Sequence, residues 1–305
     1  MFKKRLLYTV SILLVLAVAA FAAVGCGGGA EEGSGSESES VTGKIIGIDP
    51  GAGIMSTTEK AIEEYGLNFE LIEGSGATMT ASLKNAIENE KWIVVTGWTP
   101  HWKFARWDLK YLEDPKGLYG ETEYISTIAR KGLSEEMPKA YEFLDNFYWT
   151  PDDMGEVMIM NEESQDPYEN AKTWVNENMD KVGEWLPEEP YGEGSIKLGY
   201  VEWSSEVAST NVVAAVLQEV MGYDVETVPV SAAAMWEGVA SGELDAMVAA
   251  WLPTTHGHYL EKVEAEVDNL GKNLEGTRIG LVVPEYVTIN SIEELNEAAE
   301  KFSDF

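Results

Sequence analysis

Thr96–Trp102, with the sequence TGWTPHW, is the stretch around which the rest of the chain can be arranged. The apolar run Trp92–Val95 leads directly into it, which predicts a buried strand that ends in a Gly-Trp-x-Pro turn. A similar segment occurs later, where Ala246–Pro253 (AMVAAWLP) is followed by two threonines and His256. Open α/β sheets bind ligands at the carboxyl ends of their parallel strands. Two such turns in one chain therefore predict two related half-sites that face each other.

Both turns end units that have the same order of elements. In each unit we expect a strand, a helix, a second strand, a second helix and a third strand. The strands are expected at 45–48, 69–72 and 92–95 in the first unit and at 196–201, 225–228 and 246–250 in the second. The first strand and the tryptophan are 53 residues apart in one unit (Ile45 to Trp98) and 55 in the other (Ile196 to Trp251). Strands that alternate with helices predict two lobes, each with a parallel sheet.

Local signals predict where several helices begin. Ser56 and Glu59 form a capping box, which predicts the start of the first helix. Thr150 is followed by proline, the pattern of an N-cap with proline in the first helical position. Pro138–Phe147 and Ser291–Phe302 are two further expected helices.

Two segments are expected to cross between the lobes and to serve as hinges, namely Tyr124–Ala129 and the predicted strand Ile279–Val283. These crossings divide the folded part of the chain. We expect the first lobe to comprise residues 44–123 plus 285–305 and the second lobe to comprise residues 124–284.

The N-terminus has the features of a secretory signal in residues 1–25: basic Lys3–Arg5, apolar Leu6–Ala23 and small residues before Cys26. The sequence AVGC, which ends at Cys26, resembles a bacterial lipobox, so Cys26 is the expected site of lipid modification. An uncleaved membrane anchor and a soluble secreted protein are the alternatives. Residues 26–43 are rich in Gly, Ser and Glu, which predicts a flexible tether.

The composition excludes several classes of function. The net charge is −32, and it becomes −35 once the three basic residues of the signal are removed, so nucleic-acid binding is not expected. A single cysteine excludes a disulfide framework. No carboxylate pair of a glycosidase, G-x-S-x-G elbow or Cys–His pair stands out, so we expect no enzyme and no cofactor.

Three tryptophans are candidates for an aromatic cage, because Trp98 and Trp251 end strands and Trp203 follows the first strand of the second unit. Indole faces attract cations and favour quaternary ammonium groups, which are weakly hydrated. The alternative is that these tryptophans belong to the core. Six others are assigned to the core: Trp92, Trp107, Trp149, Trp174, Trp185 and Trp236.

An anion cradle is the second candidate. Gly51–Ile54 (GAGI) joins a strand to a helix, and the free N–H groups of a helix N-terminus favour a carboxylate or phosphate. No Lys-Ser/Thr follows, so it is not a P-loop, and a plain tight turn is the alternative. His256 could donate a hydrogen bond to an anion. With His258 it could also hold a metal, but further ligands at suitable spacing are missing and no metal site is expected.

Five segments resemble the substrate-binding proteins of glycine betaine/proline betaine ABC transporters: KIIGIDPGAGIM, VVTGWTPHW, YVEWSSEVAST, AAWLPTTH and RIGLVVPEYV. The resemblance extends from Gly43 to the end of the chain. It implies a bilobed α/β fold of the type II periplasmic-binding-protein class, in the circularly permuted order of elements. Glu202, before Trp203, and Ala23, in the lipobox, depart from the pattern.

The resemblance also implies roles for individual residues. Trp98, Trp203 and Trp251 would form the box around a trimethylammonium group. The backbone N–H groups of Gly53 and Ile54 and the side chain of His256 would bind the carboxylate.

The resulting hypothesis is a lipid-anchored, extracytoplasmic, monomeric binding protein that closes over glycine betaine or proline betaine and delivers it to an ABC permease in the membrane. One alternative is a ligand such as choline, carnitine or another quaternary amine. Two others are an extracellular glycan-processing enzyme with tryptophan platforms and a sensory ligand-binding domain.

Overall fold

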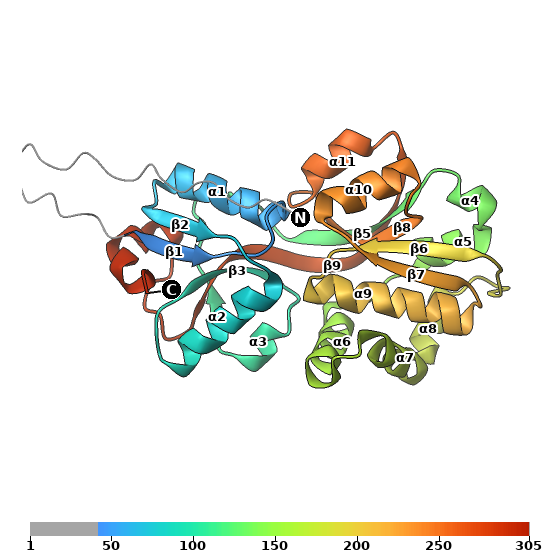
Figure 1. Cartoon of the computed structure of the whole chain (residues 1–305), viewed down its shortest axis with the longest axis horizontal. Helices are drawn as coiled ribbons and strands as arrows, with labels where there is room; N and C mark the ends of the chain where they lie inside the picture. The colour runs from blue at the N-terminus through green and yellow to red at the C-terminus, as the bar shows by residue number, and fades with distance from the viewer. Residues whose placement is uncertain (1–41, 305) are drawn as a thin grey trace, which may run out of the picture. The chain divides into compact units, whose positions relative to one another are not determined.

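The computed structural model describes residues 42–304, in which nine strands form one mixed sheet (Figure 1). The strands are β1 (Gly43–Ile46), β2 (Phe69–Ile72), β3 (Val94–Thr99), β4 (Leu109–Tyr111), β5 (Glu123–Arg130), β6 (Ser195–Tyr200), β7 (Asp224–Pro229), β8 (Ala246–Leu252) and β9 (Val267–Pro284). Their order is β2-β1-β3-β9-β5-β8-β6-β7, and β4 pairs with β9 outside this order. The expected signal peptide, Cys26 and all but the last two residues of the expected tether lie outside the described residues.

The strands of the predicted repeat form two parallel groups. β1 runs parallel to β2 and β3 in the first group, and β6 runs parallel to β7 and β8 in the second. This arrangement confirms the predicted α/β fold class. The sheet also contains antiparallel strands, because β9 runs antiparallel to β3 and β5, and β5 runs antiparallel to β8.

β9 joins the two groups. Its first part, Val267–Thr277, pairs with β5, and its second part pairs with β3 through Arg278–Val282. Figure 1 shows β9 running from one group of strands to the other, beside β5. The sequence predicted only the apolar end, Ile279–Val283, and assigned residues up to 284 to the second lobe. The earlier part was missed because buried and exposed residues are interspersed there instead of forming an apolar run.

Helices cover the sheet. They are α1 (Gly53–Tyr65), α2 (Gly76–Glu88), α3 (Lys103–Arg106), α4 (Leu133–Glu136), α5 (Pro138–Asn146), α6 (Pro151–Ser164), α7 (Pro167–Glu177), α8 (Met179–Trp185), α9 (Ser204–Ala215), α10 (Ala232–Ser241) and α11 (Gly257–Val263). A π-helical turn, Val216–Val220, continues α9. Thr150 caps α6 in a capping box with Asp153, and Pro151 is the first helical residue, which confirms that prediction.

Several predictions for individual elements were wrong. β3 runs from Val94 to Thr99 and contains Trp98, whereas a strand at 92–95 followed by a turn at Trp98 was predicted. α1 begins at Gly53, three residues before the predicted cap Ser56, whose hydroxyl instead donates to the Gly53 carbonyl (2.9 Å). β1 already begins at Gly43, which had been assigned to the tether. The predicted helix Ser291–Phe302 consists of two 3₁₀ segments, although Ser291 does form a capping box.

Most of the tryptophans assigned to the core are buried. Trp149, Trp174, Trp185 and Trp236 are each at most 2% exposed, while Trp92 and Trp107 are only partly buried against the core. No helix among residues 42–304 is both long and apolar enough to cross a bilayer.

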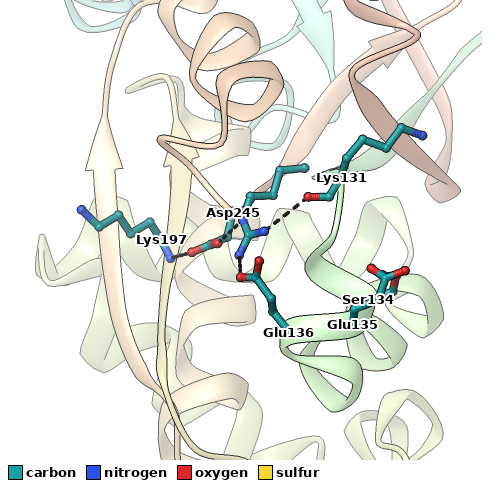
Figure 2. Close-up of polar contacts among 7 residues, drawn as sticks. Lys131, Ser134, Glu135, Glu136, Lys197 and Asp245 are labelled. Carbon is teal, nitrogen blue, oxygen red and sulfur yellow. Dashed lines mark hydrogen bonds and ion pairs between the residues drawn. The ribbon is translucent and has the colours of Figure 1, made fainter.

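A polar cluster holds together the end of the second group at which β5 ends and β9 begins. Asp245, just before β8, accepts the backbone N–H of Lys197 on β6 (2.7 Å) and forms an ion pair with Arg130 at the end of β5 (2.7 Å) (Figure 2). The guanidinium of Arg130 also binds Glu136 of α4 (2.6 Å). Because the side chains of Arg130 and Asp245 are only 13% exposed, this pair is shielded from solvent and ties β5, β6, β8 and α4 into one unit.

Candidate ligand-binding site

All six side chains or backbone groups predicted to bind a ligand line one cavity of about 310 Å³. Trp98 lies on β3, Trp251 on β8, and Trp203 is the N-cap of α9. The remaining predicted residues are Gly53 and Ile54, at the start of α1, and His256, between β8 and α11. Ile48, Ala52, Ser205, Glu206, Thr255 and Ile279 complete the lining.

The cavity is enclosed by both groups of strands, which contact each other around it. The indole N–H of Trp98, from the first group, donates to the hydroxyl of Ser205 on α9 (3.1 Å). In the opposite direction, the indole N–H of Trp203 donates to the carboxylate of Asp49 (3.0 Å), a residue that follows β1. The hydroxyl of Tyr259 on α11 also donates to the Gly51 carbonyl (2.8 Å). The structure therefore shows the two groups closed over the site.

Glu206 provides a buried carboxylate at the aromatic side of the cavity. It lies in the first turn of α9 and is 1% exposed. One oxygen accepts the indole N–H of Trp251 (2.6 Å), and the other accepts the hydroxyl of Ser205 (2.5 Å). Burial raises the pKa of Glu206 to about 7, although these two hydrogen bonds act in the opposite direction.

His256 is held in one tautomer by the backbone of Trp251. The backbone N–H of His256 donates to the Trp251 carbonyl (2.8 Å), and the backbone N–H of Trp251 donates to Nδ1 of the His256 ring (3.2 Å). Since Nδ1 accepts, the ring proton is on Nε2. Burial lowers the pKa of His256 to about 3, so the ring is neutral at physiological pH. Nε2 is buried and has no hydrogen-bond partner within residues 42–304, which leaves a donor on a residue that lines the cavity.

The N-terminus of α1 brings two more donors to the cavity. α1 begins at Gly53 after Ala52 and has no side-chain cap. The first N–H groups of a helix have no acceptor within the helix, so those of Gly53 and Ile54 are free to bind an anion. Gly53 also lies against the turn that carries His256, because a Cβ there would be 2.1 Å from the Thr255 carbonyl oxygen. Only glycine permits this close approach.

The turn after β3 places a different set of groups behind Trp98. The ring of His101 lies edge-on to Trp98 with 4.6 Å between centroids, and its Nδ1 accepts the N–H of Lys103 (3.1 Å). Nζ of Lys103 lies 4.4 Å from the Trp98 ring centroid. Lys103 is fully buried, and burial lowers its pKa to about 7. Neither His101 nor Lys103 lines the cavity.

Four polar residues at or near the site were missed by the sequence analysis: Asp49, Lys103, Ser205 and Glu206. A glutamate in the first turn of a helix is ordinarily a solvated residue that favours the helix dipole. The neighbouring Glu202, noted as a departure from the family pattern, is exposed in the structure. One signal that could have identified Glu206 is the apolar and small-residue composition of α9 around it, which is typical of a helix buried on all sides.

The lining of the site restricts its ligand. It combines three indoles and a carboxylate with donors for an anion from the His256 ring and the α1 amides, and the ring centroids of Trp203 and His256 lie 6.0 Å apart. No group of three or more His, Cys, Asp or Glu side chains in the described part of the chain is placed to hold a metal. The arrangement suits a small molecule with a weakly hydrated cation at one end and a carboxylate at the other.

Comparisons with known proteins bear on this site. A family model described as the substrate binding domain of an ABC-type glycine betaine transport system matches residues 32–177 and 194–304. The glycine betaine/carnitine transport binding protein GbuC of Listeria monocytogenes serotype 1/2a (strain 10403S) is 50% identical over 262 residues, which cover 84% of this chain and 87% of that protein.

Two solved structures are also similar. Lactococcal OpuAC, in a closed-liganded conformation with glycine betaine, is 45% identical over 47% of this chain and 57% of that chain, with a TM-score of 0.46. The glycine/betaine/L-proline-binding protein ProX from Borrelia burgdorferi is 38% identical over 48% of this chain and 56% of that chain, with a TM-score of 0.44. The chain thus spans little more than half the length of these two solved chains.

Proposed function

The chain belongs to the family of substrate-binding domains of ABC-type glycine betaine transport systems, and from this premise we propose that it captures glycine betaine in the cavity described above. The matched family consists of transport components and not of enzymes. The single observation that carries the proposal is the composition of the cavity lining. Trp98, Trp203 and Trp251 contribute indole faces to it, and His256 and the start of α1 contribute hydrogen-bond donors.

The expected contributions to the binding free energy are sufficient for the capture of glycine betaine. Three indole–cation contacts contribute about 0.5–2 kcal/mol each. Hydrogen bonds from His256 and from the amides of Gly53 and Ile54 to a charged carboxylate contribute about 1.5–3 kcal/mol each. After the cost of association, a micromolar dissociation constant, or about −8 kcal/mol, is within reach. Proline betaine carries the same two charged groups and is a related ligand.

Closure of two lobes is the proposed mechanism. The fold is the bilobed type II periplasmic-binding-protein fold, and we assign residues 44–123 plus 285–305 to the first lobe and 124–284 to the second. β5 and β9 run between the two groups of strands. We place the hinges in Tyr124–Ala129 and in Ile279–Val283, which lies next to the point where β9 changes from pairing with β5 to pairing with β3. The contacts from Trp98 to Ser205 and from Trp203 to Asp49 would then form on closing.

The proposal includes a place and a partner for the protein. As a substrate-binding component of an ABC transporter it is extracytoplasmic, and the closed form would present its ligand to a permease in the membrane. We propose that residues 1–25 are removed and that Cys26 is lipid-modified, so that a monomer is tethered to the membrane by residues 26–43.

Carnitine is the second candidate ligand, because the Listeria relative is named for both glycine betaine and carnitine. Carnitine also combines a trimethylammonium group with a carboxylate. Choline lacks the carboxylate and would leave the donors of His256 and Gly53 unpaired, so it should bind more weakly.

The test is a titration of the purified chain, without residues 1–25, followed by its tryptophan fluorescence. Glycine betaine, carnitine and choline are added separately. Saturable micromolar binding of glycine betaine that is lost in Trp251→Ala would support the proposal. Tight choline binding without a betaine response would reassign the ligand, and no response to any of the three would refute the proposed function.

A further inference from the structure

Glu206 is connected by hydrogen bonds to two of the three indoles, one directly and one through Ser205. Its Oε1 accepts the indole N–H of Trp251 directly (2.6 Å). Its Oε2 accepts the Ser205 hydroxyl (2.5 Å), whose oxygen in turn accepts the indole N–H of Trp98 (3.1 Å). Trp98 is on β3 and Trp251 is on β8, so one carboxylate orients an indole from each group of strands.

Glu206 also gives the cavity its charge. It is the one acidic side chain among the lining residues in the described range, and no basic side chain is among them. The other titratable lining residue, His256, is neutral because burial lowers its pKa to about 3. A buried carboxylate that lacks a cationic partner is costly in free energy. A ligand cation placed between the indoles would supply that partner.

We propose that Glu206 is a positioning and specificity residue of the ligand site, which fixes the indoles of Trp98 and Trp251 and supplies the negative charge that selects a quaternary ammonium group. This inference rests on the proposed capture of a betaine. A molecule of the same shape but without the cationic nitrogen would gain the apolar contacts of the cage but would leave Glu206 without a partner.

The proposal predicts that affinity depends on pH. Burial raises the pKa of Glu206 to about 7, so the free protein loses the charge as the pH falls through this value. If the ligand binds only the ionised form, its affinity at about pH 6 should be roughly tenfold weaker than at about pH 8. His256 stays neutral in this range, and burial lowers the pKa of His101 as well. Asp49, bonded to Trp203, and Glu123, bonded to Thr255, are further carboxylates near the site.

Lys103 is the one competing explanation for such a pH effect. It lies behind Trp98, and burial lowers its pKa to about 7. Protonated Lys103 would oppose a ligand cation at the same indole, which would also weaken binding at low pH. A variant without this amine must therefore accompany any variant of Glu206.

The experiment compares two probes by calorimetry at about pH 8 and at about pH 6, on either side of the Glu206 pKa. One probe is glycine betaine, and the other is tert-butylacetate, its isostere with carbon in place of the cationic nitrogen. In the unaltered protein, the preference for glycine betaine should fall by up to about tenfold on going to the lower pH. Glu206→Gln keeps an acceptor for Trp251. At both pH values, its preference for glycine betaine should be about tenfold or more below that of the unaltered protein at about pH 8, and this preference should no longer depend on pH.

Control variants separate charge from structure. Glu206→Asp keeps the carboxylate and should keep the pH dependence, and Lys103→Met should keep it too. An unchanged preference in Glu206→Gln, or a pH effect that disappears in Lys103→Met and persists in Glu206→Gln, would overturn the proposal. If Glu206→Gln does not fold, a preference that is independent of pH in the unaltered protein would overturn it equally. No binding of glycine betaine by the unaltered protein at either pH would instead refute the proposed function on which this inference rests.

Discussion

The turns that follow β3 and β8 share a Trp-x-Pro pattern but use their histidines differently. Three positions separate Trp98 from His101, whereas five separate Trp251 from His256. In the shorter turn the histidine lies edge-on to its tryptophan and away from the cavity lining. In the longer turn the histidine returns to the backbone of its tryptophan and lines the cavity.

The difference shows how a repeated unit can make a polar site. Both turns bring an indole to the cavity, but only the longer one adds a hydrogen-bond donor there. The titratable neighbours also differ, because Trp98 lies against the amine of Lys103 while Trp251 donates to the carboxylate of Glu206. The repeated strand and turn therefore supply two walls of the cavity, and the two additional residues of the longer turn make that turn part of the proposed anion site.

The largest effect is expected at the carboxylate that supports the longer turn. Oε1 of Glu123 accepts the backbone N–H groups of Thr254 (2.6 Å) and Thr255 (2.8 Å), and Oε2 accepts the Thr255 hydroxyl. Glu123→Ala would leave these donors without a partner at a buried position, and we expect a loss of about 3–5 kcal/mol in the free energy of unfolding. Denaturant-induced unfolding measures this loss.

Glu123→Gln is the matched control. Its amide oxygen can still accept both backbone N–H groups, so it should lose clearly less stability than Glu123→Ala. Equal stability of Glu123→Ala and the unaltered protein would show that the longer turn does not depend on this carboxylate.

The two indoles should contribute unequally to binding. We expect Trp251→Ala to weaken glycine betaine binding by about 3 kcal/mol, or roughly a hundredfold, because it removes a cation–π contact and releases Glu206. Trp98→Ala should weaken it by only about tenfold, because the amine of Lys103 already lies near that ring. Dissociation constants of the two variants provide the comparison, with circular dichroism to verify folding. A larger loss in Trp98→Ala would reverse our ranking of the two turns.

The two histidines provide a sharper contrast. His256→Phe keeps a ring but removes the Nε2 donor, so glycine betaine binding should weaken by about 2 kcal/mol, or roughly thirtyfold. His101→Phe retains the edge contact with Trp98 and should change the affinity by less than about threefold. Calorimetric titration of both variants tests this difference. Equal losses in the two would mean that His256 acts by packing and not by donating a hydrogen bond.

Features that depend on residues close together in the sequence were predicted, whereas features that depend on contacts between distant residues were missed. Local apolar runs and caps identified the parallel strands and the N-cap Thr150, and the two Trp-Pro turns led to the cavity. The burial of Glu206 could not be predicted in this way, because it depends on β3 and β8 packing against α9 from distant parts of the sequence. The same holds for Lys103, whose basic side chain would ordinarily be exposed. The first part of β9 was missed because its apolar residues are not contiguous.

Lys103 allows the two turns to be distinguished by the pH dependence of stability. Burial lowers its pKa from 10.5 to about 7 in the folded protein. Between these values the unfolded chain binds a proton that the folded chain does not, so stability rises as the pH increases from about 7 toward 10.5. The slope for one such group is about 1.4 kcal/mol per pH unit at most.

Lys103→Met isolates this contribution, because methionine fills a similar volume without a titratable group. The variant should be more stable than the unaltered protein at pH 7, and its advantage should shrink by about 1 kcal/mol per pH unit toward pH 9.5. Denaturant midpoints at several pH values measure the difference. The longer turn has no buried amine near Trp251, so His256→Phe should show no such slope in this range, since the pKa of His256 is about 3. If the difference in the free energy of unfolding between Lys103→Met and the unaltered protein does not change with pH, Lys103 stays protonated in the folded protein. Trp98 would then lie against a permanent cation.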